Sequence, residues 1–348
     1  MHHLHLDRGA VAALASAALF GAGAPAAKAL LADSSPWMLA GILYTASGLA
    51  LALSRKFGHR GPVGLARRDL PYLIGAVGFG GVVGPVLLMT GLQNMPASGA
   101  SLLLNAEGIF TALIAWVVMR ESTSRRIILG FVAIAAGALV LSWPGQPTFA
   151  GPAPTLAILG GCLAWGIGNN LTGRISLADA TWLAMVKGLV AGPVNLLLAV
   201  SLGAHLPALP TLVGGGLVGV LAYGISLVLF IVGMRHLGAA RAGAHYAVAP
   251  FFGAAVAVAA GEPVTRNLLL AGALMAFGVW LHVTEKHQHE HVHTPLTHTH
   301  AHTHDDLHHG HQHKPRVPAG TRHVHGHTHD PVVHSHQHYP DAHHQHDH

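Results

Sequence analysis

Residues 188–234 have the sequence GLVAGPVNLLLAVSLGAHLPALPTLVGGGLVGVLAYGISLVLFIVGM and contain no Asp, Glu, Lys or Arg. Residues 127–173 are also free of these four residue types. An apolar run of about 18 residues or more is typical of a helix that crosses a membrane, because hydrocarbon cannot satisfy an exposed backbone. Each stretch is long enough for two such helices with a short turn between them.

The whole chain has the composition of an integral membrane protein. Of its 348 residues, 51% are hydrophobic and 9% are charged, against roughly 25% charged in an average soluble protein. The apolar stretch after residue 9 is too long for a typical signal peptide, so we expect a retained helix. The single cysteine, Cys162, excludes a disulfide framework and a CxxC metal site.

The apolar pattern predicts an all-α integral membrane protein of ten transmembrane helices. The predicted segments are 10–32, 36–54, 70–92, 96–119, 127–143, 154–173, 181–202, 209–233, 242–260 and 267–284. Lys and Arg gather in alternate loops, chiefly in residues 55–68 and 120–126. This bias predicts a multi-pass protein of the inner cell membrane with both termini in the cytoplasm.

An internal repeat relates the two halves of the chain. The matches keep their order, and their offset drifts only from 145 to 141: Phe20 with Trp165, Trp37 with Trp182, Gly91 with Gly233, and Glu121 with Glu262. Two halves of five helices each have opposite orientations in the membrane, which predicts an inverted repeat. We expect five-helix repeats at 9–143 and 154–284, followed by a tail at 285–348. Chance similarity between Gly/Ala-rich helices is the alternative.

Ionisable residues inside the predicted spans are candidates for transport, because charge is costly in a bilayer. Glu107 lies about 16 Å into the fourth helix at 1.5 Å per residue. It could bind a cation or exchange a proton, or it could be a protonated packing residue. Lys187 lies one to two turns into the seventh helix and Lys28 near the outer end of the first. Either lysine could instead extend its charge to the membrane surface.

Several polar residues lie close to predicted interruptions of the helices. Asn169 and Asn170 occupy positions in the sixth helix that correspond to an Ala-Pro pair in the first, which favours a gating or midplane site. His245 and Tyr246 enter the ninth helix just before Pro250, although a lone histidine often only packs.

Three further residues have mainly structural interpretations. Asn105 is two residues from Glu107, so it faces elsewhere and favours a packing hydrogen bond. Glu121 and Glu262 end helices at opposite faces, and we expect them to pair with Arg125 and Arg266.

The tail contains most of the chain's 31 histidines, largely alternating with other residues. It has few apolar residues and several prolines, which predicts disorder without a ligand. Imidazole suits Ni, Zn, Co and Cu, so we expect reversible binding of divalent metal at several weak sites; a solubilising role is the alternative. The candidate ligands are His298, His300, His302, His304, His323, His325, His327, His329, His334, His336 and His338.

The chain resembles the EamA type of the drug/metabolite transporter superfamily. The residues that carry the resemblance are Phe20-Gly21 with Lys28, Trp165-Gly166, Leu104-Asn105-Ala106-Glu107, Ala249-Pro250, Arg120-Glu121 and Gly261-Glu262. The chain departs from the family pattern at Gly108 and Leu43. The resemblance implies secondary transport, often efflux of amino acids or other small metabolites.

Together these features predict a secondary transporter, with efflux favoured, that moves a small solute by alternating access. The solute is either a divalent metal delivered or sensed by the tail, or an organic metabolite whose flux metal regulates. A membrane-anchored metal buffer or sensor without transport is the competing function. No nucleotide-binding loop, paired catalytic carboxylates or nucleophile elbow favours an enzyme or an ATP-driven pump. We expect lipid as a partner, no nucleic acid and no required cofactor, and a homodimer is left open.

Overall fold

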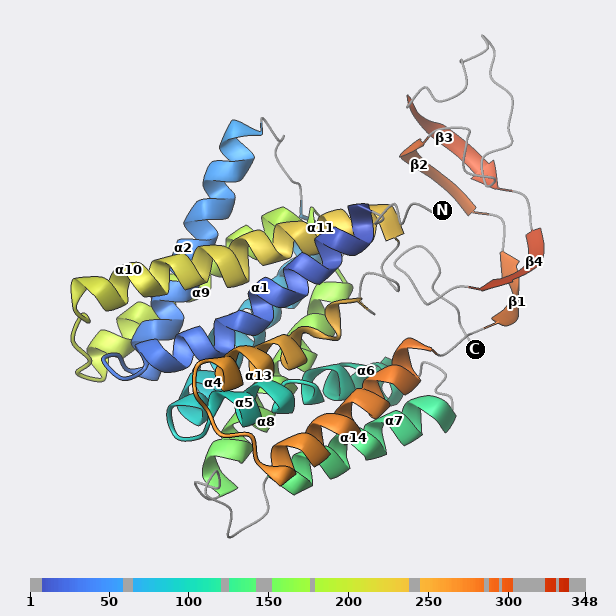
Figure 1. Ribbon diagram of the computed structural model, residues 1–348. Coiled ribbons are helices and arrows are strands. Elements are labelled where there is room, and N and C mark those ends of the chain that lie inside the picture. The colour runs from blue at the N-terminus through green and yellow to red at the C-terminus, as the bar shows by residue number, and fades with distance from the viewer. Residues whose placement is uncertain are drawn as a thin grey trace, which may run out of the picture. The chain divides into compact units, whose positions relative to one another are not determined.

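The computed structural model describes residues 8–58, 65–119, 125–141, 152–175, 179–237, 245–284, 288–293, 296–302, 323–329 and 332–337. Within these residues, helical structure lies in each of the ten predicted apolar segments (Figure 1). In chain order the elements are α1 (Arg8–Leu30), α2 (Pro36–Phe57), η1 (Arg67–Asp69), α3 (Leu70–Val77), η2 (Gly78–Val83), α4 (Gly84–Gln93), α5 (Ala97–Leu103), α6 (Ala106–Met119), α7 (Arg125–Leu141), α8 (Pro152–Gly173), α9 (Ala180–Ser201), α10 (Leu209–Val218), η3 (Gly219–Ile225), α11 (Ser226–Leu237), α13 (Ala249–Ala259) and α14 (Arg266–Val283).

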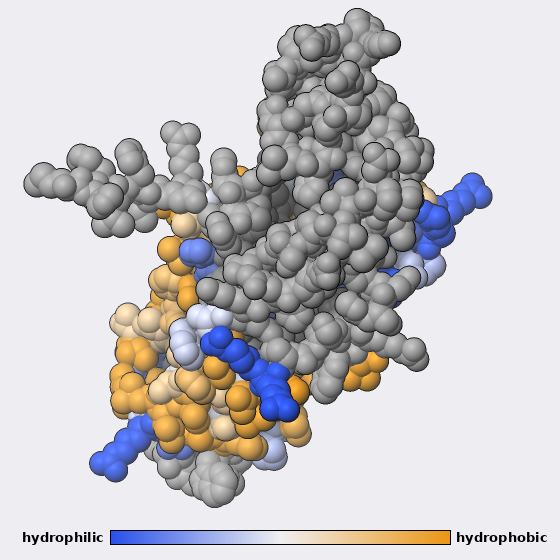
Figure 2. Space-filling model, turned by 90° about the vertical axis from the view of Figure 1, so that its right-hand side faces the viewer, coloured by the Kyte–Doolittle hydropathy of each residue, from blue (hydrophilic) through white to orange (hydrophobic). Residues whose placement is uncertain are grey.

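The helices have the lengths and surfaces of a membrane protein. Five described spans are long and apolar enough to cross a membrane, namely Gly9–Leu30, Pro36–Phe57, Arg67–Gln93, Thr181–Ser201 and Leu209–Phe230, and shorter apolar helices lie at Ile128–Leu141, Ala249–Ala259 and Arg266–Leu281. Apolar residues cover much of the coloured surface in Figure 2. Large apolar side chains such as Leu197 and Leu269 are exposed, as expected where lipid replaces water.

Six helix pairings organise the bundle. Helix α1 packs against α11 and α13, and α8 packs against α4 and α6, while α2 pairs with α9 and α7 with α14. Small residues allow close approach: a side chain on Gly48 would lie 2.6 Å from the Leu189 nitrogen, and one on Gly278 would lie 2.7 Å from the Gly130 oxygen. Such contacts replace the hydrophobic drive that lipid does not supply.

Four of the predicted spans are not uniform α-helices. The third contains the π-helix η2 and the eighth contains the π-helix η3. The fourth is broken between α5 and α6 at Leu104 and Asn105. In the ninth, α13 begins only at Ala249, with proline in its first turn. Inserted π-turns are frequent at functional sites, so these irregular regions are where a site is expected.

The tail contains strands and is described by itself, as a separate unit of residues 286–340. Strands β1 (Gln288–His293) and β4 (Val332–Gln337) form one antiparallel pair, and β2 (Leu296–His302) and β3 (His323–His329) form another. The structure assigns strands to these four segments, whereas the sequence analysis predicts a tail that is disordered without a ligand. Histidine alternation has a period of two residues, which is the period of a strand, and the interleaved Thr and Val favour strands.

Candidate functional site

The break in the fourth span places Glu107 in the first turn of α6. The backbone N–H of Asn105 donates to Leu102 at 3.1 Å, and that of Glu107 donates to Leu104 at 3.1 Å, so the chain makes a tight turn here. The first turn of a helix favours a carboxylate because its N–H groups point toward it. The Asn105 side chain is buried and donates to the Leu102 carbonyl at 2.8 Å. This contact supports the packing interpretation of Asn105.

Helix α8 supplies the direct partner of the Glu107 carboxylate. Asn169 Nδ2 donates to Glu107 Oε1 at 2.8 Å. Asn170 instead donates to the Thr111 carbonyl at 3.0 Å and to the Gly166 carbonyl at 2.8 Å, so it fastens α8 to α6. Of the two predicted asparagines, Asn169 therefore contacts the candidate acid and Asn170 positions the helices.

Lys187 of α9 brings a positive charge into the same region. Its ammonium and the Glu107 carboxylate interact electrostatically. Among the described residues, however, Lys187 makes no hydrogen bond and no ion pair. Glu107 and Lys187 are half-buried and Asn169 is exposed. We call Glu107, Asn169 and Lys187 the charged site.

The π-helix η2 borders the charged site and receives side chains from three other helices. The Gly80 carbonyl accepts hydrogen bonds from the Tyr44 hydroxyl and the Trp165 indole N–H, each at 3.0 Å. The Gly81 carbonyl accepts one from Asn195 Nδ2 at 3.0 Å. Tyr44, Trp165 and Asn195 are buried. These contacts fix η2 against α2, α8 and α9.

Aromatic rings lie on the other side of Tyr44. The Tyr44 and Tyr223 centroids are 5.5 Å apart, and Phe20 lies 5.9 Å from Tyr223 and 5.6 Å from Tyr246. The hydroxyls of Tyr44, Tyr223 and Tyr246 interact electrostatically with Glu107. Tyr246, a candidate site residue from the sequence, is therefore close enough to Glu107 to interact with it electrostatically. Its neighbour His245 is half-buried at the start of the same span.

Two other predicted residues lie together at one end of the bundle. Lys28 Nζ donates to the Gln93 carbonyl at 2.9 Å and interacts electrostatically with Glu262. The Glu262 carboxylate accepts from the N–H groups of Ala97 at 2.6 Å and Ser98 at 2.9 Å. The expected pairing of Glu262 with Arg266 was therefore wrong: the carboxylate caps α5. Glu121 lies outside the described residues.

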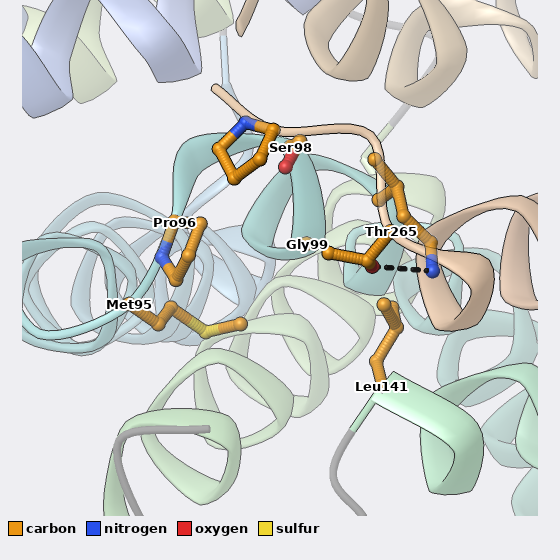
Figure 3. Close-up of a pocket in the computed structure, with 8 residues that line it drawn as sticks. Met95, Pro96, Ser98, Gly99, Leu141 and Thr265 are labelled. Carbon is orange, nitrogen blue, oxygen red and sulfur yellow. Dashed lines mark hydrogen bonds between the residues drawn. The ribbon is translucent and has the colours of Figure 1, made fainter. Parts of the chain in front are cut away.

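A small hollow beside this cap has no charged lining (Figure 3). Its lining residues come from α5 and the turn before it, from the end of α7, and from α14 and the loop before it. In that last region the Leu268 N–H donates to Thr265 Oγ1 at 3.1 Å. Without a charged or convergent polar group, it does not have the chemistry of a solute site.

Metal ligands do not cluster in the described side chains, where no group of three or more His, Cys, Asp or Glu residues gathers. The tail histidines have described backbone only. His304 and His338 lie outside the described residues. In the registers, His298 is opposite His327, His300 opposite His325, His302 opposite His323, His289 opposite His336, and His291 opposite His334.

Sequence reasoning missed Tyr44, Tyr223, Asn195 and two glycines of η2, Gly80 and Gly81, as parts of the site. One local signal was present: Pro85 follows Gly81 by four residues inside an apolar span. A proline there leaves carbonyls without a backbone donor and marks a helix distortion. Cys162 is buried near the site, with its Sγ 3.7 Å from the Leu103 carbonyl.

Comparisons with known proteins agree with this architecture. Residues 7–143 match the model of the EamA-like transporter family. A Methanothermobacter thermautotrophicus protein named an uncharacterized transporter is 27% identical over 297 residues, covering 78% of this chain and 85% of that protein. A solved structure described only as a crystal structure of a protein has a TM-score of 0.60 at 17% identity, covering 79% of this chain and 98% of that one. The last likeness shows the fold.

Proposed function

We propose that the chain is an EamA-type secondary transporter of a small zwitterionic organic solute, since residues 7–143 match the EamA-like transporter family and a relative at 27% identity is named a transporter. The observation that carries this proposal is the charged site. Glu107 and Lys187 carry opposite charges, interact electrostatically and are not joined in an ion pair among the described residues.

Two separated side chains of opposite charge favour a solute that carries both a cationic and an anionic group. A cationic group would bind the Glu107 carboxylate and an anionic group the Lys187 ammonium. Inside a membrane each fixed charge gains from a charged partner, because the surroundings screen it weakly. The rings of Phe20, Tyr223 and Tyr246 offer an apolar surface beside the charges.

The same geometry disfavours a bare divalent metal ion as the transported solute. Lys187 would repel a cation close to Glu107, since like charges in a weakly screened site are costly. The first-row metals favoured by imidazole also take several His, Cys or carboxylate ligands, and the described side chains provide no such cluster. Of the two solutes expected from the sequence, we therefore propose the organic one.

Alternating access between two inverted five-helix halves is the proposed mechanism. If the two halves correspond, α1 is equivalent to α8, α4 to α11 and α6 to α13. The pairs α1–α11 and α1–α13 then correspond to the pairs α8–α4 and α8–α6. The α2–α9 and α7–α14 pairs convert into themselves. The two π-helices start at Gly78 and Gly219, an offset of 141 that agrees with the sequence repeat. These relations support a pseudo-two-fold axis, about which the halves would rock. Export is proposed as the direction, on the family resemblance.

For the tail we propose divalent metal binding that regulates transport. The register supports this role, because it places histidines of β2 opposite histidines of β3. Directly opposite residues in an antiparallel pair lie about 4.5–5.5 Å apart, which is close enough to share one ion. The test is to measure the flux of the organic solute with and without added divalent metal, in the full chain and in a chain that lacks residues 286–348.

The test of the transport proposal is counterflow in proteoliposomes. The solutes would be radiolabelled zwitterionic amino acids, the matching amines and carboxylic acids, and Ni²⁺ and Zn²⁺. We expect transport of zwitterions, and a large loss in Glu107→Gln and Lys187→Gln. Asp69→Asn is the control, because Asp69 lies in η1 outside the charged site. Transport of the metals alone, or full zwitterion transport by both site variants, would overturn the proposal.

A further inference from the structure

Pro85 accounts for the unusual hydrogen bonding of η2. Proline has no N–H. In an α-helix the Gly81 carbonyl would bond the nitrogen of residue 85, so it is left without a backbone donor. The N–H of Gly84 is directed to the Phe79 carbonyl, as a π-helix requires. The Gly80 carbonyl would then bond residue 85 as well, and it too is left without a donor.

Side chains from three helices supply the missing donors. Tyr44 and Trp165 satisfy the Gly80 carbonyl and Asn195 satisfies that of Gly81. A buried carbonyl without a partner is costly, so these bonds specify where the η2 backbone lies. The position of η2 is thus tied to α2, α8 and α9.

Two glycines of η2, Gly80 and Gly81, leave the space that the Lys187 side chain occupies. A Cβ on Gly80 would lie 3.1 Å from Lys187 Nζ and 3.6 Å from its Cε. A Cβ on Gly81 would lie 3.1 Å from Lys187 Cγ. The lysine chain therefore runs over the bare backbone of η2, and its ammonium lies at Gly80.

We infer that the η2 backbone positions the Lys187 ammonium to bind the anionic group of the solute, and that Gly80 is a specificity-determining residue. This inference rests on the proposed function. Lysine has a long, flexible side chain, and a side chain that is already held in place loses less freedom when a solute binds. Gly80 sets the place of the charge, and Tyr44 and Trp165 set the place of Gly80.

The experiment compares the same substitution at two glycines of η2. In Gly80→Ala the new methyl group meets the ammonium. In the matched control, Gly78→Ala, the methyl group has nothing within 4 Å. Each variant is made in the natural chain and in Lys187→Gln, and the readout is the preference for a zwitterionic amino acid over the corresponding amine in counterflow. Size-exclusion profiles and thermal unfolding in detergent check the fold.

We expect Gly80→Ala to lower this preference roughly threefold to tenfold, because a small misplacement of a binding group is costly. Gly78→Ala should leave the preference unchanged, and Gly80→Ala should have no further effect in Lys187→Gln. A non-additive result of this kind indicates that Gly80 acts through Lys187. If Gly80→Ala does not fold, Tyr44→Phe removes one donor to Gly80 and should lower the preference in the same direction.

The contrary outcomes are distinct. Equal effects of Gly80→Ala and Gly78→Ala, or an equal effect of Gly80→Ala with and without Lys187, would make η2 a packing element only and overturn the inference. No effect of Gly80→Ala would do the same. An unchanged preference in Lys187→Gln would overturn the assignment of Lys187 in the proposed function itself.

Discussion

Arg55 and Asp179, 124 residues apart in the chain, are joined by a 2.6 Å hydrogen bond from the guanidinium to the carboxylate. Asp179 also caps α9, because its other oxygen accepts the N–H groups of Thr181 at 2.8 Å and Trp182 at 3.1 Å. One carboxylate therefore both starts α9 and ties it to α2, the helix with which it pairs along its length.

Replacement of Asp179 is expected to destabilise the protein in a pH-dependent way. Burial alone would raise the pKa of the Asp179 carboxyl, but Arg55 and the helix N–H groups hold it below its ordinary value of 3.8. The stabilisation is thus present at neutral pH, above the unfolded pKa, and is lost as pH falls below about 4 through the folded value. Asp179→Ala should cost about 1–2 kcal/mol near pH 7.

Thermal unfolding in detergent at several pH values measures the effect of Asp179→Ala. The difference from the natural chain should shrink in acid. Asp69→Asn is the control. Within the part of the chain that the structure describes, Asp69 pairs with Arg68 at 3.8 Å, and because the Arg68 side chain is 88% exposed, the pair should contribute little. A loss in Asp179→Ala that is the same at pH 7 and pH 3 would contradict the assignment.

Glu262 is expected to protect the start of α5 from hydrogen exchange. Its two carboxylate oxygens accept the N–H groups of Ala97 and Ser98, which a helix start otherwise leaves unsatisfied. Glu262→Ala should speed exchange at these amides and cost about 1–2 kcal/mol, with a smaller effect in Glu262→Gln. Exchange mass spectrometry on residues 94–104 measures it. Unchanged protection in both variants would remove Glu262 from its role as the cap.

Two glycines should respond oppositely to alanine. A Cβ on Gly21 would collide with the Ala249 carbonyl and lie 3.0 Å from the Gly253 nitrogen, whereas one on Gly108 meets nothing within 4 Å. Gly21→Ala should therefore lower stability by about 1–3 kcal/mol through overpacking. Gly108→Ala should leave stability unchanged or raise it by up to about 1 kcal/mol, because alanine favours helix. Melting temperatures of the two variants in one detergent decide this; equal melting would refute close α1–α13 packing.

Metal binding by the tail should weaken as pH falls. Only neutral imidazole binds metal, and an unperturbed histidine has a pKa of about 6.5, so protons compete with metal between about pH 5 and 7. Equilibrium dialysis of the full chain with Ni²⁺ or Zn²⁺ should show several bound ions at about pH 7.5 and far fewer at about pH 5.5. The chain shortened after Glu285 is the control. Equal binding at both pH values would exclude histidine as the main ligand.

Both termini are expected on the cytoplasmic side. Reporter fusions after His348 and after Gly145 should lie on opposite sides of the membrane, the first inside, because Arg and Lys gather in the loops assigned to the cytoplasm. The reversed result would refute the orientation. Both reporters on one side would refute the five-plus-five inverted repeat.

The sequence predicted the elements well where one local property decides them. The second predicted segment, 36–54, corresponds to Pro36–Phe57, and the tenth, 267–284, to Arg266–Val283, because apolar length alone specifies a spanning helix. The ninth was predicted as one span from residue 242. In the structure His245 and Tyr246 are helical, and a turn at residues 247–248 separates them from α13, which begins at Ala249. Apolar composition is the same in a helix and in a turn between helices, so it could not locate that turn.

The site was only partly predictable for a different reason. Glu107, Lys187 and Asn169 stand out as polar residues in apolar surroundings, and the structure brings them together. The roles of Tyr44, Trp165 and Asn195 depend on carbonyls 36, 85 and 114 residues away. Such partners follow from how helices pack and not from the periodicity of any one segment. The same holds for Glu262. Its carboxylate contacts the N-terminal end of helix α5, far away in the sequence, and not the nearby Arg266.

The buried position of Cys162 simplifies spectroscopic work on this protein. It is the chain's single cysteine, and its residue has no exposed surface, so maleimide reagents should not reach it in the folded state. A cysteine pair introduced at two exposed sites would then take up fluorophores or spin labels selectively, with no prior removal of native thiols. Distances between the two halves could be followed in an otherwise natural chain.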